Sequence, residues 1–482
     1  MIIRNISNNT LYLSDIDVHI PYKNGATEEF EPDILKKSKC LRGFLIHDMI
    51  EIVEYNPDEK IEASIVFLRN QARQKKQIED NIKPVKQVKS DNSDNFNSIA
   101  LDSINDEIEV RMHGIFFDAG GYGKVNRNLA LKLSEAGIKL KIDPKNSQNQ
   151  LQESELKKIV DLTKTEISKN HISIDSVIPS FSEYSTGKYR ILYTTIESYT
   201  IPKQFLDCCQ FYNEIWVTSP WSASILKKET KTPVYVIPAG VDNELYKEEG
   251  PRFDFKPNIK DFVFISVFGW SYRKGYDVLL KSYFDEFDAN DNVSLLIVSR
   301  YQSQTSRFHR NKIKDDIDQI MTGFPNKDMP HVARYSQIIS EKDMPKLYRS
   351  ANCFVLSSRG EGSCLPPVEA SLCGLPIIMT NVSGQQMYIR NDNSFPIEMD
   401  KLVEIQQGQM HLHYWDGQKF PALTSPKVHN DLRKSMRYVF ENYEEAKQRN
   451  HKMQKLITEQ FTWNNTANAA LKRLQEIKEK IL

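Results

Sequence analysis

Two stretches of the chain alternate apolar runs with amphipathic segments, and this alternation limits the fold more than any other feature. The first stretch contains the apolar runs "IEVRMHGIFF", "LKID", "YRILYTT", "EIWVTS" and "PVYVIPAG". The second contains "FVFISVFG", "VSLLIVSR", "HVARYS", "NCFVLSS" and "PIIMTN". Segments with apolar residues at helical spacing, such as "KVNRNLALKLSEAGI", separate the runs. This order is typical of a parallel sheet with helices on both faces, so the sequence predicts two doubly wound α/β domains.

A length of 482 residues suits two or three domains. We expect the first α/β domain at residues 106–250, the second at 251–455, and a closing helix at 456–482. Ahead of them, residues 1–68 alternate polar with β-branched and aromatic residues around Asn24-Gly25, which predicts a small strand-rich module. Residues 69–105 are dominated by Lys, Gln, Asn, Asp and Ser, which predicts a linker.

Charge and cysteine content exclude several classes of protein. Lys+Arg and Asp+Glu both number 64, so a net basic field for nucleic acid is absent. The linker lysines alternate with acids and amides, which favours a solvated tether, although contact with nucleic acid or a membrane surface stays open. Six cysteines without a CxxC pair indicate buried thiols in a reducing compartment. The first residues lack a signal-peptide core and no run reaches the about 20 apolar residues of a membrane span, so we expect a cytoplasmic protein.

The stretch "RGEGSCLPPVEASLCGLP" carries two glutamates, Glu361 and Glu369, directly after an apolar run. The prolines predict that a helix starts near Pro367, and Gly374 ends it, so that Glu361 lies in a loop and Glu369 in a first helical turn. Amide groups between the two carboxylates would form an anion site. An alternative is that Glu369 only caps the helix and Glu361 is solvated. The expected anion site comprises Gly362, Ser363, Cys364 and Leu365.

This stretch resembles the E-x7-E signature of the group-1 retaining glycosyltransferases, which have the GT-B fold of two facing Rossmann-like domains. Four further segments resemble the family in order and spacing, so that the resemblance covers roughly residues 108–480. The module at residues 1–68 lies outside it. The four segments are "FISVFGWSYRKGYDVLLKSY", "EKDMPKLYRSANCFVLSSRGEG", "EIWVTSPWSASIL…PVYVIPAGVDNELY" and "FTWNNTANAALKRL".

The resemblance implies roles for residues of the second domain. Glu361 would contact the transferred sugar, and Glu369 the ribose of the nucleotide. Arg273 and Lys274 would bind the diphosphate, next to Gly269 at the end of the first strand of that domain. No metal would be required. A solvated turn is the alternative for the two basic residues, and Trp270 stands where the family often has an arginine.

In the first domain, the Gly-rich stretch "FFDAGGYGKVNRN" would line the cleft with Gly121, Gly123 and Asn126. It also approaches a dinucleotide fingerprint, with Asp143 at the end of the next strand, so an NAD-linked oxidoreductase is a rival interpretation. Many relatives carry a histidine in this domain, but "IDSVIPSF" has none. Glu197 in "YTTIESYTIP" is the candidate acceptor-side residue, and a surface carboxylate is the alternative.

The resemblance therefore implies a retaining transfer of a sugar from a nucleoside-diphosphate sugar to a hydroxyl of a glycan, a protein or another polymer. No cofactor is expected beyond the nucleotide sugar itself. Besides the NAD-linked enzyme, the alternatives are a catalytically retired sugar-nucleotide-binding or structural protein, and an epimerase or hydrolase on the same fold. A partner-binding role for the N-terminal module stays open.

Overall fold

The computed structural model divides into two compact units, residues 1–91 and residues 92–482. It describes residues 2–5, 11–13, 18–20, 27–29, 50–54, 108–145, 151, 153–179, 187–253, 259–300, 311–407, 409–410 and 413–481.

The described part of the N-terminal unit consists of short strands. One three-stranded sheet has the order β4-β1-β5 with antiparallel pairing, and β2 pairs with β3 in a second antiparallel pair. All of them lie in the segment for which the sequence predicts a strand-rich module, whereas the Asn24-Gly25 turn and the predicted linker lie outside the described residues. The strands are β1 (Ile2–Asn5), β2 (Leu11–Leu13), β3 (Val18–Ile20), β4 (Thr27–Glu29) and β5 (Ile50–Glu54).

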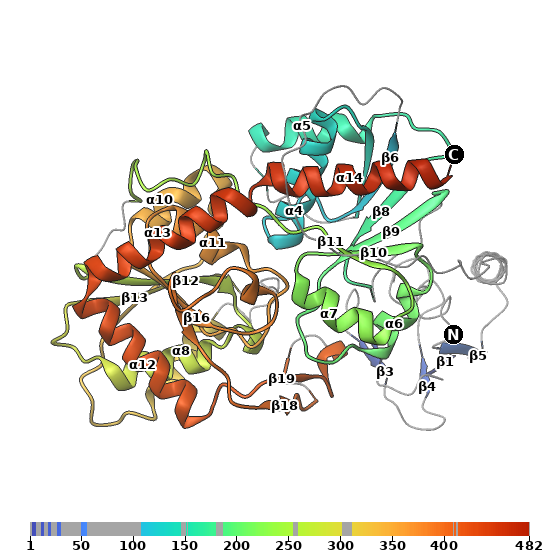
Figure 1. Cartoon of the computed structure of the whole chain (residues 1–482). Helices are drawn as coiled ribbons and strands as arrows, with labels where there is room; N and C mark the ends of the chain where they lie inside the picture. Colours follow the sequence, from blue (N-terminus) through green and yellow to red (C-terminus); the bar gives the residue numbers. More distant parts are fainter. Residues whose placement is uncertain are drawn as a thin grey trace. The chain divides into compact units, whose positions relative to one another are not determined.

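The first large sheet of the other unit has six parallel strands in the order β11-β10-β9-β8-β6-β7 (Figure 1). Its strands are β6 (Glu109–Gly114), β7 (Lys139–Pro144), β8 (Ile172–Ser176), β9 (Tyr189–Thr194), β10 (Glu214–Val217) and β11 (Val234–Val236). The helices that connect them are α4 (Gly121–Glu135), α5 (Glu153–Thr163), α6 (Lys203–Cys209) and α7 (Pro220–Glu229).

The second large sheet also has six parallel strands, in the order β14-β13-β12-β15-β16-β17. Its strands are β12 (Phe262–Gly269), β13 (Val293–Arg300), β14 (His331–Tyr335), β15 (Cys353–Leu356), β16 (Ile377–Thr380) and β17 (Phe395–Ile397). Its helices are α8 (Tyr276–Glu286), α9 (Lys312–Met321), α10 (Met344–Arg349), α11 (Leu365–Leu372), α12 (Pro426–Glu441) and α13 (Tyr443–Gln460). Shorter elements are η2 (Tyr272–Lys274), η4 (Glu341–Asp343), η5 (Ser383–Met387), η6 (His413–Trp415) and the antiparallel pair β18 (Leu402–Glu404) and β19 (Lys419–Pro421).

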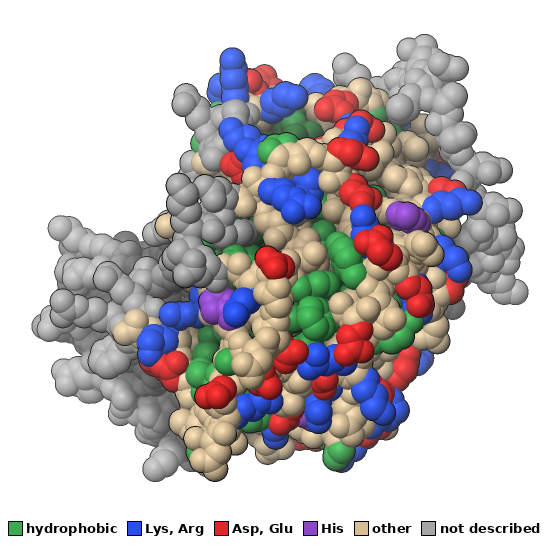
Figure 2. Space-filling model, turned by 90° about the vertical axis from the view of Figure 1, so that its left-hand side faces the viewer, with side chains coloured by type: hydrophobic (Ala, Val, Ile, Leu, Met, Phe, Trp, Pro, Cys, Tyr) green, Lys and Arg blue, Asp and Glu red, His purple; other side chains and the backbone are tan. Residues whose placement is uncertain are grey.

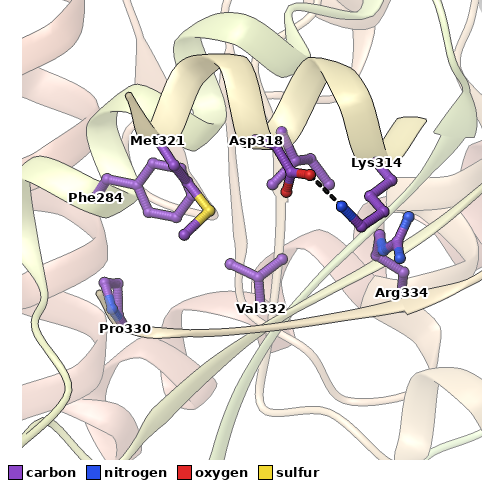
Figure 3. A pocket seen from close by; sticks show the side chains of 8 residues that line it. Phe284, Lys314, Asp318, Met321, Pro330, Val332 and Arg334 are labelled. Carbon is purple, nitrogen blue, oxygen red and sulfur yellow. Dashed lines mark hydrogen bonds and ion pairs between the residues drawn. The ribbon is translucent and has the colours of Figure 1, made fainter. Parts of the chain in front are cut away.

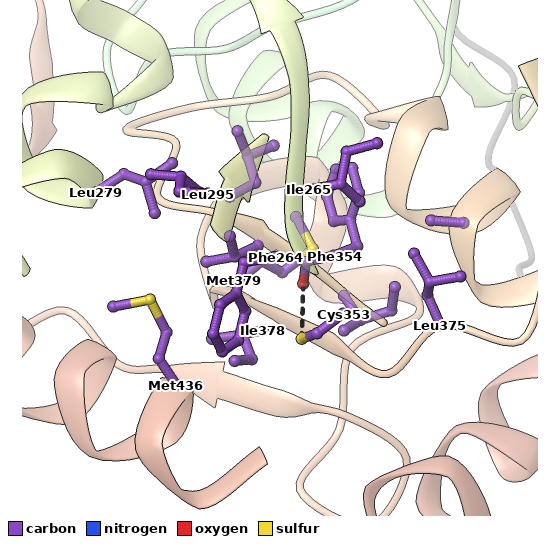
Figure 4. Close-up of a cluster of buried hydrophobic side chains, with 14 of the residues drawn as sticks. Phe264, Ile265, Leu279, Leu295, Cys353, Phe354, Leu375, Ile378, Met379 and Met436 are labelled. Atoms are coloured by element: carbon purple, nitrogen blue, oxygen red, sulfur yellow. Dashed lines mark hydrogen bonds between the residues drawn. The ribbon is translucent and has the colours of Figure 1, made fainter. Parts of the chain in front are cut away.

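The core of the second sheet explains why its strands are apolar along their whole length. Both faces are covered by helices, so Phe264 of β12 and Phe354 of β15 are fully buried. Leu279 of α8 and Met436 of α12 belong to the same buried cluster (Figure 4). Continuous burial of this kind holds the strands in place, and with them the loops that follow the strands.

The last helix, α14 (Trp463–Ile481), packs on the core of the first sheet, against α4. Arg473 of α14 donates to the buried carboxylate of Glu214 in β10, with Nη2 at 2.6 Å from Oε2. Trp216 Nε1 and Tyr189 Oη donate to the same carboxylate at 2.7 and 2.8 Å. The chain therefore crosses back from the second sheet to the first, as the resemblance implies.

The surface agrees with the zero net charge of the sequence. Figure 2 shows one face, on which acidic and basic side chains are interspersed around a narrow apolar area. Within the residues that the structure describes, no helix combines the length and apolarity that crossing a bilayer requires.

Candidate active site

The strand order of the second sheet reverses between β12 and β15, and ligands of doubly wound proteins bind at such a switch point, beyond the carboxyl ends of the strands. The loop after β12 holds η2, and the loop after β15 runs from Ser357 to Cys364. In the first sheet the order reverses between β6 and β8, and the loop after β6 leads to the Gly-rich start of α4. The predicted site residues of the second domain and of the Gly-rich stretch thus lie at the switch points of the two sheets, whereas Glu197 follows β9.

The turn after β12 is pressed against the end of β15. Gly275 has φ +70°, and a Cβ at this position would lie 1.7 Å from the carbonyl oxygen of Ser357. Only glycine accepts both the left-handed backbone and this approach. The turn that contains Arg273 and Lys274 is therefore held next to the loop of Glu361.

A buried arginine clamps the same two loops together. Arg359, 1% exposed, donates to both carboxylate oxygens of Asp277 at 2.8 and 2.7 Å, and its guanidinium lies 3.7 Å from the ring centre of Tyr272. Its backbone N–H donates to the carbonyl of Arg273 at 2.7 Å. A planar guanidinium suits this bidentate and stacked arrangement, so Arg359 positions the basic turn.

Four charged groups meet where these loops face the first domain. Lys274 Nζ lies 2.6 and 2.8 Å from the two oxygens of Glu361, and Arg273 lies 3.4 Å from the same carboxylate. Arg273 also lies 3.1 Å from Glu197, at the end of the first domain's β9 segment. Ser358 Oγ donates to Glu361 at 2.6 Å. The structure thus brings together Arg273, Lys274, Glu361 and Glu197, which the sequence places in three separate segments.

The pKa values of the two carboxyl groups at this place, those of Glu361 and Glu197, are shifted in opposite directions. Burial raises the pKa of Glu361, but Lys274 and Arg273 outweigh this effect and hold its pKa below the ordinary value. For Glu197, burial raises the pKa and outweighs the opposing charge of Arg273. Burial lowers the pKa of Arg273, yet Glu197 and Glu361 raise it overall. Glu361 is consequently a firmly ionised group, whereas Glu197 holds a proton more readily.

The second signature carboxylate occupies a separate interdomain cluster. Glu369 lies 2.5 Å from Lys124 Nζ of the first domain, and Tyr348 Oη donates to it at 2.9 Å. Lys124 also lies 3.0 Å from Glu341 and donates to Tyr246 Oη at 2.8 Å. Burial lowers the pKa of Lys124, but Glu369 and Glu341 raise it above its ordinary value. A lysine near the start of α4 therefore holds the carboxylate that the resemblance assigns to the ribose.

The helix that carries Glu369 begins earlier than predicted. It starts at Leu365 rather than near Pro367, which places Glu369 in the second turn and corrects the expected first-turn position. Both prolines fit because the first N–H groups of a helix have no acceptor within it. Pro366 and Pro367 also contribute no N–H, so the amides available for an anion are those of the residues that precede them. Cys364 has φ +63° and gives the helix no side-chain cap.

The other predicted donor residues surround this turn. Tyr388 Oη donates to the carbonyls of Ser363 and Cys364 at 2.8 Å each, which orients the loop. Gly269 ends β12 and is exposed, while Trp270 is buried and donates to Asp316 at 2.8 Å. The side chain of Trp270 thus packs in the interior of the second domain. The basic groups that contact Glu361 are Arg273 and Lys274.

The two domains touch through glycines of the segment 360–364, here called the signature loop. A Cβ on Gly362 would lie 1.6 Å from Thr195 Oγ1, and one on Gly360 would lie 2.0 Å from the carbonyl oxygen of Glu197. Any side chain at either position would force the domains apart. The structure therefore describes a closed arrangement, in which the charged groups of the site satisfy one another.

The Gly-rich loop contributes in different ways. Gly121 opens α4 with free space around it, whereas a Cβ on Gly123 would lie 2.2 Å from the carbonyl oxygen of Asp118. Asn126 is fully buried, donates to the carbonyl of Ile115 at 2.9 Å and accepts from Ser176. Asn126 thus supports the loop instead of facing the cleft.

Sequence reasoning missed several residues of the site. Lys124 directly follows a glycine that the sequence singles out, and Ser358 and Arg359 directly precede the signature loop, so their positions carried a signal. Tyr122 in the first turn of α4 lies beside Thr194, with 3.3 Å between the two hydroxyl oxygens.

A recess elsewhere on the second domain is a poor candidate. It has a volume of about 200 Å³, below the about 300–1,000 Å³ of ordinary ligand pockets, and it lies between α9 and the edge strand β14 (Figure 3). None of the predicted site residues lines it. Its lining consists of Phe284, Lys314, Ile317, Asp318, Met321, Pro330, Val332 and Arg334.

The two facing domains, with their site loops at both switch points, define the GT-B fold. Residues 259–407 match the family model described as glycosyl transferases group 1. A probable sucrose-phosphate synthase of Thermosipho melanesiensis is 23% identical over 253 residues, which are 52% of this chain and 48% of that protein. The chain thus spans about half the length of this curated relative.

Solved structures share the fold. Sucrose-phosphate synthase from Thermosynechococcus elongatus has a TM-score of 0.54 at 14% identity, over 78% of this chain and 100% of its own. HepE of Anabaena, in complex with UDP-glucose, has a TM-score of 0.53 at 12% identity, over 77% of this chain and 100% of its own. The predicted GT-B fold is confirmed, and the resemblance to the group 1 glycosyltransferases is confirmed over residues 259–407.

Proposed function

We propose that the protein is a retaining glycosyltransferase that moves a sugar from a nucleoside-diphosphate sugar to an acceptor hydroxyl. The observation that carries this proposal is the meeting of Arg273, Lys274 and Glu361 at the switch point of the second sheet, against Glu197 of the first domain. The match to the group 1 family and the UDP-glucose bound by HepE support a nucleotide sugar as the donor.

The chemistry asks for stabilisation of a departing diphosphate. Arg273 and Lys274, with the amides of residues 362–365, present positive charge and dipoles where negative charge would grow. In the free protein both cations are paired with carboxylates. A bound diphosphate therefore takes over their charge, and Glu369 turns from Lys124 to the ribose.

Glu361 orients the sugar in this proposal. Its lowered pKa keeps it ionised, so its oxygens accept hydrogen bonds from sugar hydroxyls. Ser383 Oγ accepts from its backbone N–H at 2.8 Å and fixes the loop. Closure of Gly360 and Gly362 on the first domain excludes water, which would otherwise compete as an acceptor. The departing phosphate itself takes the acceptor proton.

We further propose that the transfer needs no metal, because the two cations already face the diphosphate. Among the residues that the structure describes, no group of three or more His, Cys, Asp or Glu side chains is arranged to hold a metal ion. Turnover should therefore persist in excess EDTA, and its loss would contradict this part of the proposal.

The experiment is a thermal-shift screen of UDP, GDP, ADP, CDP, TDP and their sugars, with NAD included. A tight donor stabilises the fold, by about 2.7 kcal/mol at a hundredfold excess over its Kd. The best nucleotide sugar is then assayed for release of nucleoside diphosphate, with and without added sugars as acceptors. Release that disappears in Glu361→Ala and persists in Glu441→Ala, which changes an exposed α12 carboxylate, supports the proposal.

The alternatives give different results. Stabilisation by NAD alone indicates the oxidoreductase. Binding of a nucleotide sugar without any turnover indicates a retired binding protein. Turnover that acceptors never stimulate indicates a hydrolase or epimerase. Absence of any shift with every nucleotide refutes the proposed function.

A further inference from the structure

One segment of the second domain leaves its own sheet and becomes part of the core of the first domain. The segment, here called the arm, comprises the described residues between 400 and 423: β18, η6 and β19 with their connections. It follows β17 of the second sheet, and its turn η6 packs on Phe205 of α6 in the first domain. In Figure 1, β18 and β19 are drawn below α7. Four of its side chains are almost fully buried in one cluster with the first domain: Ile405, Met410, Trp415 and Phe420.

Hydrogen bonds fix the arm next to Glu197. The N–H of Tyr199 donates to the carbonyl of Lys419 at 2.9 Å, and the N–H of Lys419 donates to Thr200 Oγ1 at 2.9 Å. On the other side, the Phe420 ring comes within 3.1 Å of a Cβ placed on Gly360, the residue before Glu361. The arm therefore lies beside both the segment of the acceptor-side carboxylate and the signature loop, at the place where these two contact each other.

The arm brings one further aromatic side chain to this place. The ring of Tyr414 packs on Phe205 of the first domain, with 5.2 Å between ring centres, and on Trp415, at 4.6 Å. Trp415 is 3% exposed and anchors the turn, whereas Tyr414 is only partly buried. The charges of the site act on its hydroxyl group. Burial raises the pKa of Tyr414, the negative charge of Glu197 raises it further, and the positive charge of Arg273 lowers it. The phenol consequently stays protonated.

We propose that Tyr414 contacts the acceptor, and that the group it contacts is a neutral sugar ring or polyol that carries the accepting hydroxyl. This inference rests on the proposed function. The arm thus lets the donor-binding domain contribute to the acceptor wall, together with Glu197 and Tyr122.

The chemistry of this wall fits such a ligand. An aromatic ring offers an apolar face to the C–H groups of a sugar ring, while its hydroxyl donates to a sugar oxygen. The raised pKa of Tyr122, caused mainly by burial, keeps a second phenol neutral. Glu197 accepts hydrogen bonds from hydroxyls. Since Arg273 and Lys274 serve the diphosphate, the groups identified for the acceptor are two phenols and a carboxylate, which favour a neutral polyol over a phosphorylated one.

The test separates acceptor binding from donor binding. The donor is the nucleotide sugar that the thermal-shift screen selects, and the acceptor panel is glucose, mannose, fructose, maltose and glycerol, with glucose 6-phosphate for comparison. For Tyr414→Ala we expect the acceptor KM to rise about tenfold or more, while the affinity for the nucleoside diphosphate, measured by calorimetry, changes less than about twofold. Tyr414→Phe should restore most of the acceptor affinity, because it keeps the ring.

Tyr438→Ala is the matched control, because Tyr438 is exposed on α12. An unchanged acceptor KM in Tyr414→Ala overturns the inference, and so does an equal loss of nucleotide affinity, which would indicate a structural role. A wild-type protein that binds a nucleoside diphosphate but is stimulated by no neutral sugar of the panel, or only by the phosphorylated one, also overturns it. An unchanged acceptor KM, an equal loss of nucleotide affinity, or stimulation only by the phosphorylated sugar leaves the proposed function standing, whereas failure to bind any nucleoside diphosphate refutes both.

Discussion

Replacing Glu361 by glutamine should separate nucleotide binding from transfer. In the free protein, Lys274 is engaged by Glu361 at 2.6 Å, and the side chain of Glu361 is only 5% exposed. A diphosphate must compete with this carboxylate for the lysine. Glutamine keeps the size and one hydrogen bond but loses the charge. A charge-assisted hydrogen bond contributes about 1.5–3 kcal/mol and a neutral one about 0.5–1.5 kcal/mol, so the competition weakens by about 1–2 kcal/mol.

We therefore expect Glu361→Gln to bind the nucleoside diphosphate about 5- to 30-fold more tightly, while release from the nucleotide sugar falls because the sugar loses its ionised partner. Isothermal calorimetry with the nucleotide selected by the screen measures the first effect, and a coupled release assay measures the second. Glu441→Gln controls for the loss of one negative charge on the second domain. An affinity in Glu361→Gln that is unchanged or weaker than in the wild type would contradict the competition between carboxylate and phosphate.

Three further outcomes follow from contacts of the described residues. Arg473→Met breaks the buried ion pair of α14 and should lower the free energy of unfolding by about 3–5 kcal/mol in urea titrations; a change below about 1 kcal/mol would contradict the packing of α14. Gly360→Ala meets the carbonyl of Glu197 and should abolish transfer while nucleotide binding persists, as calorimetry and activity together would show; full transfer would exclude the closed arrangement. Lys139 lowers the pKa of Glu109 to about 2, so Glu109 stabilises the fold above pH 4.5, and this stability is lost as the pH falls toward 2. Glu109→Gln should flatten the stability–pH curve in that range, and an unchanged slope would exclude the assignment.

The fold was predictable because a parallel sheet that is buried on both faces requires strands that are apolar along their whole length, and such runs are visible in the sequence. Strands such as β12 and β15 are apolar over their whole length, and the intervening helices carry apolar residues at helical spacing. The residues around Glu361 were predictable for a related reason. A parallel sheet gathers the ends of its strands at one edge, so the residues that directly follow β12 and β15 meet there without any further information.

Contacts between the two domains were not predictable in this way. The pairing of Lys124 with Glu369 joins residues 245 positions apart, and their meeting depends on how two separately folded sheets close on one another. Tyr414 carried still less signal, because the arm has no strong periodicity of its own and is ordered by apolar contacts with the other domain. The start of α11 was misjudged because two consecutive prolines restrict the backbone before them but cost nothing in a first helical turn.

The closed arrangement also bears on the order of affinities. Arg273 and Lys274 are each paired with a carboxylate, and a bound diphosphate would take both cations from Glu197 and Glu361. A nucleoside diphosphate alone therefore leaves two largely buried carboxylates without a counter-ion, which costs free energy. In the proposed reaction, the sugar of the intact donor and the hydroxyls of the acceptor would return hydrogen-bond donors to these carboxylates. On this argument the nucleotide sugar should stabilise the closed protein more than the nucleoside diphosphate does. The acceptor would then offset the remaining free-energy cost of the two buried carboxylates. Binding of the nucleotide sugar should therefore favour binding of the acceptor.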